Sequence, residues 1–202
     1  MPVVQVTGTP FYIAARASAP YKTLAEFVAF AKQNPGVANY GSSGASISLA
    51  GEVLQEKAGI KFTRIPFNGS APVMTALLGG HVDFFIGPAQ LIRPQVEAGK
   101  LTLLAHTGIG ELKTFPGLVS LRSAGIDMTL YETLGAFVAK DTPKSIIAAL
   151  GEAFRSAMDS PEFKAFCEKN EIVMTYRSSE QFAEMIRQER VLYAPALSRM
   201  PK

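Results

Sequence analysis

The sequence predicts an α/β fold with a largely parallel sheet. Short apolar runs alternate with segments of helical periodicity through the first hundred residues, which is typical of strand–helix–strand units. Glycine, proline and asparagine separate most of these segments. One run, residues 82–87, is apolar almost throughout, as expected of a strand that is covered on both faces.

The first elements carry clear local signals. Residues 3–15 are rich in β-branched and aromatic side chains, with interruptions at Gly8 and Pro10, and are predicted to be extended. Thr23 and Glu26 form a capping-box pattern that predicts a helix start, and Asn34-Pro35-Gly36 predicts its end. The same alternation then predicts strands at 37–40, 62–66, 82–87 and 101–106, and helices at 47–58, 72–78 and 91–98.

In the second half, strand and helix signals alternate less regularly. Residues 107–131 give a weak signal with one short predicted helix at 119–124, and residues 133–140 form a second extended run. Thr142 and Pro143 predict a helix start with Pro143 at its first position. The remaining elements are predicted as a helix at 161–169, a strand at 172–176 and a helix after the capping pair Ser178 and Gln181. The chain is therefore expected to divide into residues 1–16, 17–131 and 132–202.

Composition excludes several classes of function. The 202 residues carry a net charge of +3, and the basic residues are spread singly along the chain, which argues against a nucleic-acid partner. Cys167 is the only cysteine, so neither a disulfide framework nor a multi-cysteine metal site is expected, and its helical spacing predicts burial. No apolar run reaches the ~20 residues of a membrane span, and residues 1–6 lack the pattern of a signal peptide.

Two polar loops are the candidate binding elements. The first runs over residues 41–46 and the second over residues 67–71, and each joins the end of a predicted strand to the start of a predicted helix. Helix N-termini present free backbone amides and a partial positive charge, which favours anions. Such ends of strands also bind ligands in open α/β sheets. Glycine, serine and asparagine are equally the usual residues of turns and caps, so either loop alone admits a purely structural interpretation.

No catalytic constellation is present in the sequence. Residues 41–44 match neither a dinucleotide-binding fingerprint nor a phosphate-binding loop, and the only histidines are His81 and His106. His81 follows a helix exit, where it would meet free carbonyls, and His106 is expected to be a satisfied edge residue, with a position facing a cleft as the alternative. Asp83 and Glu132 are too far apart in sequence to be argued as a pair. The prediction is a protein without enzymatic activity, metal or cofactor.

Six motifs and the C-terminal helices resemble the tripartite tricarboxylate transporter substrate-binding family, also called the Bug receptors. The match extends over nearly the whole chain, and the individual motifs are loose, whereas their order and spacing are specific. The matching segments are residues 19–24, 31–36, 40–44, 66–72, 77–83 and 98–101, together with 152–169 and 178–189.

The resemblance implies a type II-like periplasmic binding protein with two lobes joined by crossing strands. Such a receptor closes on a small carboxylate, whether a dicarboxylate, a tricarboxylate, an acidic amino acid or an aromatic acid, and passes it to membrane transporter subunits. The implied location of the full-length protein is the periplasm. The ligand-binding residues implied by the matching loops are Ser42, Ser43, Gly44, Ser46, Asn68, Gly69 and Ser70.

Two departures from the family pattern bear on the expected function. The family's first strand and glycine-rich loop have no counterpart after Met1, so the first lobe is expected to be incomplete, to bind ligand poorly and to promote self-association. The family often has an aromatic residue before the glycine at Gly135, where this chain has Leu134. The alternatives are the acid-sensing effector domain of a transcription regulator, which needs a preceding helix-turn-helix, and a hydrolase that uses the serine loop.

Overall fold

The computed structural model describes residues 1–113, 115–170 and 172–200, which form two compact units. Unit 1 contains Met1–Thr9 and Tyr131–Ala194, and unit 2 contains Pro10–Leu130 together with residues 195–200. The sequence-based division placed residues 195–200 with the segment that begins at residue 132, whereas their contacts lie in unit 2. The interpretation of the units as lobes of a clamp stays a prediction.

Unit 2 is built on a mixed five-stranded sheet in the order β4-β3-β5-β2-β6. β3 pairs in parallel with β4 and β5, whereas β2 pairs antiparallel with β5 and β6. The α/β class is therefore confirmed, but the expectation of a largely parallel sheet is only partly right. β2, which precedes the strand–helix units, lies between β5 and β6, and periodicity alone does not reveal such an insertion. The strands are β2 Tyr12–Arg16, β3 Asn39–Ser42, β4 Thr63–Pro66, β5 Phe84–Gly87 and β6 Leu101–His106.

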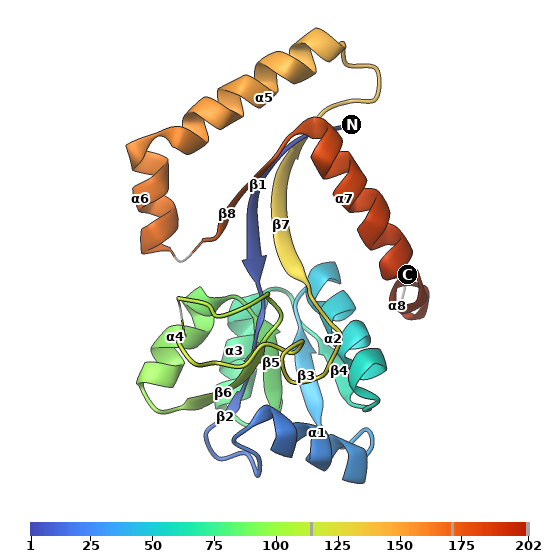
Figure 1. Cartoon of the computed structure of the whole chain (residues 1–202). Helices are drawn as coiled ribbons and strands as arrows, with labels where there is room; N and C mark the ends of the chain where they lie inside the picture. The colour runs from blue at the N-terminus through green and yellow to red at the C-terminus, as the bar shows by residue number, and fades with distance from the viewer. Residues whose placement is uncertain (114, 171, 201–202) are drawn as a thin grey trace. The chain divides into compact units, whose positions relative to one another are not determined.

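Four helices connect these strands, as Figure 1 shows. The predicted capping box is confirmed, because the Thr23 hydroxyl accepts a hydrogen bond from the Glu26 amide and the Glu26 carboxylate accepts one from the Thr23 amide. The next three helices begin two residues before their predicted starts. The helices are α1 Leu24–Gln33, α2 Ala45–Ala58, α3 Ser70–Leu78 and α4 Ala89–Glu97.

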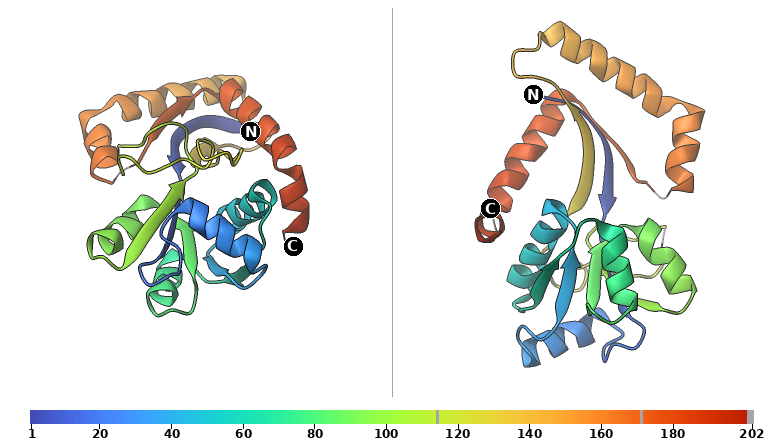
Figure 2. Two further views of the ribbon diagram at one scale, coloured as in Figure 1. Left: turned by 60° about the horizontal axis from the view of Figure 1, so that its bottom comes forward. Right: turned by 180° about the vertical axis from the view of Figure 1, so that it is seen from behind.

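Helices α2 and α3 cover opposite faces of this sheet (Figure 2). The neighbouring β3 residues Tyr40 and Gly41 point to opposite sides. A methyl group added at Gly51 of α2 would come within 2.1 Å of the Tyr40 hydroxyl, and one added at Gly41 would come within 2.3 Å of Val73 of α3. Both helices therefore approach the sheet closely because glycine stands at the contact.

The segment after β6 does not form the helix predicted at 119–124. Ser120 instead makes a parallel bridge with His106, and the Leu121 amide donates to the His106 carbonyl at 2.9 Å. A hydrogen-bonded turn follows and ends at Gly125, whose φ of 85° suits glycine. Pairing with the end of β6 thus replaces the intrahelical bonds that the local sequence favoured.

Unit 1 contains a three-stranded sheet in the order β7-β1-β8. The strands are β1 Pro2–Pro10, β7 Tyr131–Phe137 and β8 Met174–Arg177. The central strand β1 pairs antiparallel with β8, with Gln5 opposite Arg177. Val3, Val4 and Val6 of β1 form a core with Ile147 and Met158.

The helices of unit 1 confirm some of the predicted caps and correct another. Pro143 is the N-cap residue of its helix rather than its first helical residue, and no side chain caps this end, so the predicted role of Thr142 is wrong. The extended ψ of 142° at Pro143 delays the helix by one residue. Ser178 and Gln181 form the predicted capping box. The helices are α5 Lys144–Asp159, α6 Pro161–Lys169, α7 Ser179–Leu192 and the unpredicted α8 Ala194–Arg199.

Two further side chains confirm or extend the sequence analysis. Cys167 is buried, as predicted, and burial raises the pKa of its thiol. Arg199 of α8 forms ion pairs with Glu52 and Glu56 of α2, which attach the C-terminal segment to unit 2. No helix in the described part of the chain has both the length and the apolar character that a membrane crossing requires.

Candidate functional site

The candidate site lies at the end of the unit 2 sheet where β3, β4 and β5 terminate. Because β3, β4 and β5 are parallel, their carboxyl ends meet at the same edge, and each is followed by a helix start. The N-cap residues of α2, α3 and α4 are Gly44, Gly69 and Pro88, and none of them supplies a side-chain hydrogen bond to its helix. The start of α4 was not among the predicted site elements, because no serine or glycine loop marks it in the sequence.

The two predicted loops are joined directly. The hydroxyl oxygens of Ser43 and Ser70 lie 2.8 Å apart, and the Phe67 amide donates to the Ser42 carbonyl at 2.8 Å. The Ser43 and Ser70 side chains are both partly exposed. Two segments that are 27 residues apart in sequence therefore form one polar surface at the edge of the sheet.

Ser42 has a different environment from Ser43. It is 2% exposed, and its hydroxyl lies 2.6 Å from that of the buried Ser48. Arg64 of β4 approaches the same Ser48 hydroxyl at 3.4 Å from Nη1. Ser42 thus supports the first loop from its buried side. Sequence reasoning missed Ser48 and Arg64, because neither belongs to a loop motif.

The other predicted residues lie on the exposed side of the loops. Gly44 and Asn68 are exposed, and Ser46 is exposed in the first turn of α2 rather than in a loop. Gly69 has a φ of 102°, which other residues rarely adopt. All seven predicted residues therefore lie in or beside two helix starts, and their contact with a ligand stays a prediction.

The electrostatics of these helix starts suit an anion. The first amides of an α-helix have no intrahelical acceptor, and neither α2 nor α3 has an acidic residue in its first turn. The partial positive charge of each N-terminus is therefore not offset by a nearby carboxylate of the same turn. Together with the hydroxyls of Ser43 and Ser70, the arrangement can donate several hydrogen bonds to one carboxylate.

His106, at the end of β6, is fully buried, and its imidazole contacts the surrounding backbone. Its Nδ1 accepts a hydrogen bond from the Gly108 amide at 3.1 Å. Burial lowers the pKa of His106, while the interaction with the Leu118 backbone acts in the opposite direction. With Nδ1 engaged in this way, His106 does not act as a general base for Ser43 or Ser70 in this arrangement.

The described residues contain no group of three or more histidine, cysteine, aspartate or glutamate side chains placed to hold a metal ion. Asp83 lies near the opposite edge of the sheet, where it accepts from Arg16 at 3.1 Å and from the Asn39 amide at 2.9 Å. A cavity of about 580 Å³ in unit 2 is lined by residues 109–111, 117–120 and 122–123 and contains none of the predicted site residues.

Comparison with known proteins places these features in a family. The model of the family described as "Tripartite tricarboxylate transporter family receptor" matches residues 1–197. A curated relative from Cupriavidus necator, named "UPF0065 protein in gbd 5'region", is 35% identical over 184 residues, which are 90% of this chain and 56% of the relative. The chain thus spans little more than half the length of that relative.

Solved structures agree with the fold. A TctC solute-binding protein from Polaromonas, solved without ligand, superposes with a TM-score of 0.82 at 28% identity, over 98% of this chain and 69% of that one. Rpa4515 from R. palustris, solved with adipate, gives a TM-score of 0.84 at 22% identity over 98% of this chain and 67% of that one. The predicted family and its fold are therefore confirmed.

Proposed function

The chain belongs to the tripartite tricarboxylate transporter receptor family, and we propose that its Ser43 and Ser70 loops bind a carboxylate group of a small extracytoplasmic solute. Members of the family are periplasmic solute-binding proteins. The bound solute would then pass to the membrane subunits of a tripartite tricarboxylate-type transporter.

One observation carries this proposal. The starts of α2 and α3 both lack a side-chain cap and an acidic first turn, and the 2.8 Å contact between Ser43 and Ser70 brings them together. Amides at a helix start without a cap, together with two neighbouring hydroxyls, can donate several hydrogen bonds to one anion. The adipate in the R. palustris protein supports a carboxylate as the ligand class.

The site's residues do not select among carboxylates. Backbone amides and hydroxyls donate to any carboxylate in the same way, so the loops define the charge and geometry of one end of the ligand. Discrimination between a dicarboxylate, a tricarboxylate, an acidic amino acid and an aromatic acid would depend on other walls of the binding site.

Isothermal titration of the chain with adipate and with adipamide tests the proposal. The two compounds have the same carbon chain, but adipamide is neutral and presents amide groups in place of carboxylates. Because the incomplete first lobe is expected to weaken binding, the titration needs high ligand concentrations; the proposal then expects weak heat of binding with adipate, malate or citrate and none with adipamide. Equal binding of adipate and adipamide, or no binding of any carboxylate in a panel covering the four ligand classes, would contradict it.

A receptor should return its ligand unchanged. Chromatography of adipate and of ester substrates after prolonged incubation with the chain should show no product. Turnover that disappears in Ser43→Ala would instead favour the hydrolase alternative. The family match over residues 1–197 favours the receptor over the transcription-regulator alternative.

Self-association is the second part of the proposal. Unit 1 exposes large apolar side chains on β7, α5, α6 and α7, and strands β7 and β8 are the edges of its sheet. Exposed apolar surface and unpaired edges both favour association. Sedimentation velocity should show concentration-dependent oligomers, whereas a monomer across the accessible concentration range would contradict this part. The exposed side chains include Leu134, Phe137, Ile146, Phe166 and Val191.

A further inference from the structure

The basic surplus of the chain is concentrated in unit 2. Residues 10–130 and 195–202 contain 12 lysines and arginines against 7 aspartates and glutamates, whereas the residues of unit 1 contain 8 against 10. These numbers correspond to net charges of +5 and −2, which sum to the +3 of the whole chain. A net charge of this size attracts anionic partners and accelerates their association.

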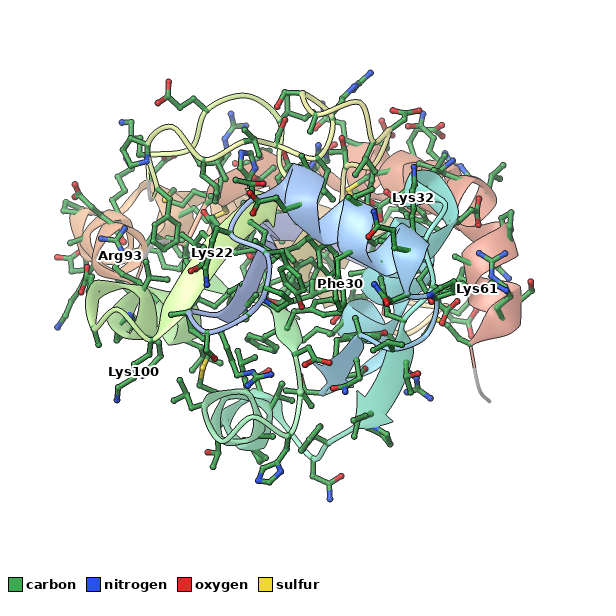
Figure 3. All side chains as sticks on the ribbon, turned by 90° about the horizontal axis from the view of Figure 1, so that it is seen from below. Lys22, Phe30, Lys32, Lys61, Arg93 and Lys100 are labelled. Atoms are coloured by element: carbon green, nitrogen blue, oxygen red, sulfur yellow. The ribbon has the colours of Figure 1, made fainter. Side chains whose placement is uncertain are left out.

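Part of this surplus lies on one face, here called the basic face and defined by Lys22, Lys32, Lys61 and Lys100. All four side chains belong to exposed residues. Figure 3 looks onto this face and shows Phe30 between Lys32 and Lys61 on one side and Lys22 and Lys100 on the other. The residues are widely separated in sequence, so their spacing along the chain gave no sign of the cluster.

Backbone contacts fix the two halves of the basic face. The Ala17 amide donates to the Lys100 carbonyl at 2.9 Å, and the Lys22 ammonium donates to the carbonyls of Ala17 and Ala19. On the other side, the Gly36 amide donates to the Lys61 carbonyl at 3.0 Å. Helix α1 joins the halves and carries Lys32 in its last turn.

Nearby acidic groups offset only part of this charge. Glu26 accepts hydrogen bonds from the Lys22 and Thr23 amides, and Asp83 is paired with Arg16. Glu97, at the end of α4, precedes Lys100 by three residues. In the part of the chain that the structure describes, Lys32, Lys61 and Lys100 form no ion pair.

The basic face is remote from the serine loops. It lies at the amino ends of β3, β4 and β6, whereas Ser43 and Ser70 follow the carboxyl ends of β3 and β4. Strands of four to six residues separate the two edges by roughly 13–20 Å. This distance exceeds the Debye length of about 8 Å at physiological ionic strength. The basic face therefore contributes little to holding a small solute at the loops.

We propose that the basic face docks reversibly on an anionic phospholipid surface. Lysine is depleted at protein–protein interfaces, where aromatic residues and arginine are enriched, and this face offers four lysines with a single half-buried aromatic ring at Phe30. Flexible, hydrated ammonium groups act as point charges, which suits a fluid layer of headgroups. Each lysine near such a surface contributes up to about 1 kcal/mol, so binding is weak and reversible.

Vesicle co-sedimentation of the full chain tests this proposal. Vesicles of phosphatidylcholine with about 30 mol% phosphatidylglycerol should bind the chain, and pure phosphatidylcholine vesicles should not. Lys32→Gln, Lys61→Gln and Lys100→Gln combined should lower the partition coefficient by at least about tenfold. Raising the salt to about 0.5 M should have a similar effect, because it shortens the Debye length.

The matched control combines Lys140→Gln, Lys144→Gln and Lys169→Gln. These exposed lysines lie in unit 1, and their removal changes the net charge by the same amount. The control should bind vesicles as the unmodified chain does, and circular dichroism should show that both variants are folded. Single changes at Lys61 and Lys100 should each give a partial loss.

Three outcomes would overturn the proposal. The first is absence of binding to phosphatidylglycerol vesicles, and the second is an equal loss in the unit 1 control, which would indicate a general charge effect. The third is binding to soluble poly-glutamate without binding to vesicles, which would assign the basic face to an acidic protein partner. None of these outcomes depends on whether the serine loops bind a carboxylate.

Discussion

The hydroxyl groups of Ser43 and Ser70 contact each other at 2.8 Å across the starts of two helices. Each hydroxyl has one proton and two lone pairs, so in this pair one serine donates to the other and keeps acceptor capacity. A carboxylate bound at the loops would reorient both protons toward itself. The contact therefore couples the two loops before a ligand arrives.

Replacing either serine should weaken binding of a carboxylate. Ser43→Ala and Ser70→Ala each remove one donor, and a net loss of about 1 kcal/mol corresponds to roughly fivefold weaker affinity. The double variant should lose less than the sum, because the two hydroxyls act as a unit. Titration calorimetry with adipate measures all three. Ser18→Ala, in an exposed turn just after β2, is the control, and an equal loss of affinity there would contradict the central role of the serine pair.

A methyl group at position 51 should destabilise unit 2. It would come within 2.1 Å of the buried Tyr40 hydroxyl, and such overpacking typically costs 1–3 kcal/mol. Thermal unfolding of Gly51→Ala should show a clear decrease in Tm. Gly151→Ala is the matched control, since it lies in helix α5 with no neighbouring atom within 4 Å of the added carbon. It should be neutral or stabilising by up to about 1 kcal/mol, and the same loss in both variants would refute the packing explanation.

Protonation of His106 should make the fold less stable in mild acid. Burial lowers its pKa in the folded state below the ordinary value of 6.5. As the pH falls below about 6.5, the unfolded chain binds this proton more readily, so the free energy of unfolding decreases. His106→Asn retains an acceptor for the Gly108 amide but does not titrate. Denaturant unfolding measures the free energy of unfolding of this variant and of the parent chain. Between about pH 7 and about pH 5, this free energy should change less with pH in the variant.

Loss of the Asp83 carboxylate should destabilise unit 2 at the amino ends of β3 and β5. Asp83 accepts from Arg16 of β2 and from the Asn39 amide of β3, so it connects two strands that are not neighbours. Asp83→Asn retains one acceptor but loses the charge, and a loss of about 1 kcal/mol is expected for this half-buried pair. Urea unfolding measures it. Asp127→Asn, whose ion pair with Arg122 is exposed, should change stability little, and the reverse ranking would count against the structural role of Asp83.

The sequence predicted the elements of unit 2 well because their signals are local. The capping box at Thr23 and the apolar strand at 84–87 depend on neighbouring residues alone. The insertion of β2 between β5 and β6 depends on contacts between residues about 70 and 90 positions apart, which no local pattern contains. The absent helix at 119–124 has the same cause, since Ser120 pairs with His106 instead.

The candidate site also combines features that have a local sequence signal with features that depend on tertiary contacts. Ser43 and Ser70 could be proposed from loop composition and family resemblance, but their contact required the parallel pairing of β3 with β4. Ser48 contacts Ser42 from a helix, and Arg64 contacts Ser48 from a strand. At such positions sequence reasoning expects packing rather than a polar network. The basic face depends equally on tertiary structure, because a backbone hydrogen bond from Gly36 to Lys61 places Lys61 near the end of α1, which carries Lys32.

The position of β1 at the centre of the unit 1 sheet has a consequence for biosynthesis. β1 is synthesised before its partners β7 and β8, which follow more than 120 and 160 residues later. By then residues 10–130 can already have formed their own sheet, whereas Val3, Val4 and Val6 still lack a core. Pairing over such long separations is slow and leaves apolar strands open to aggregation. Yield of the folded chain in cells should therefore depend on keeping β1 in solution until β7 and β8 have been made.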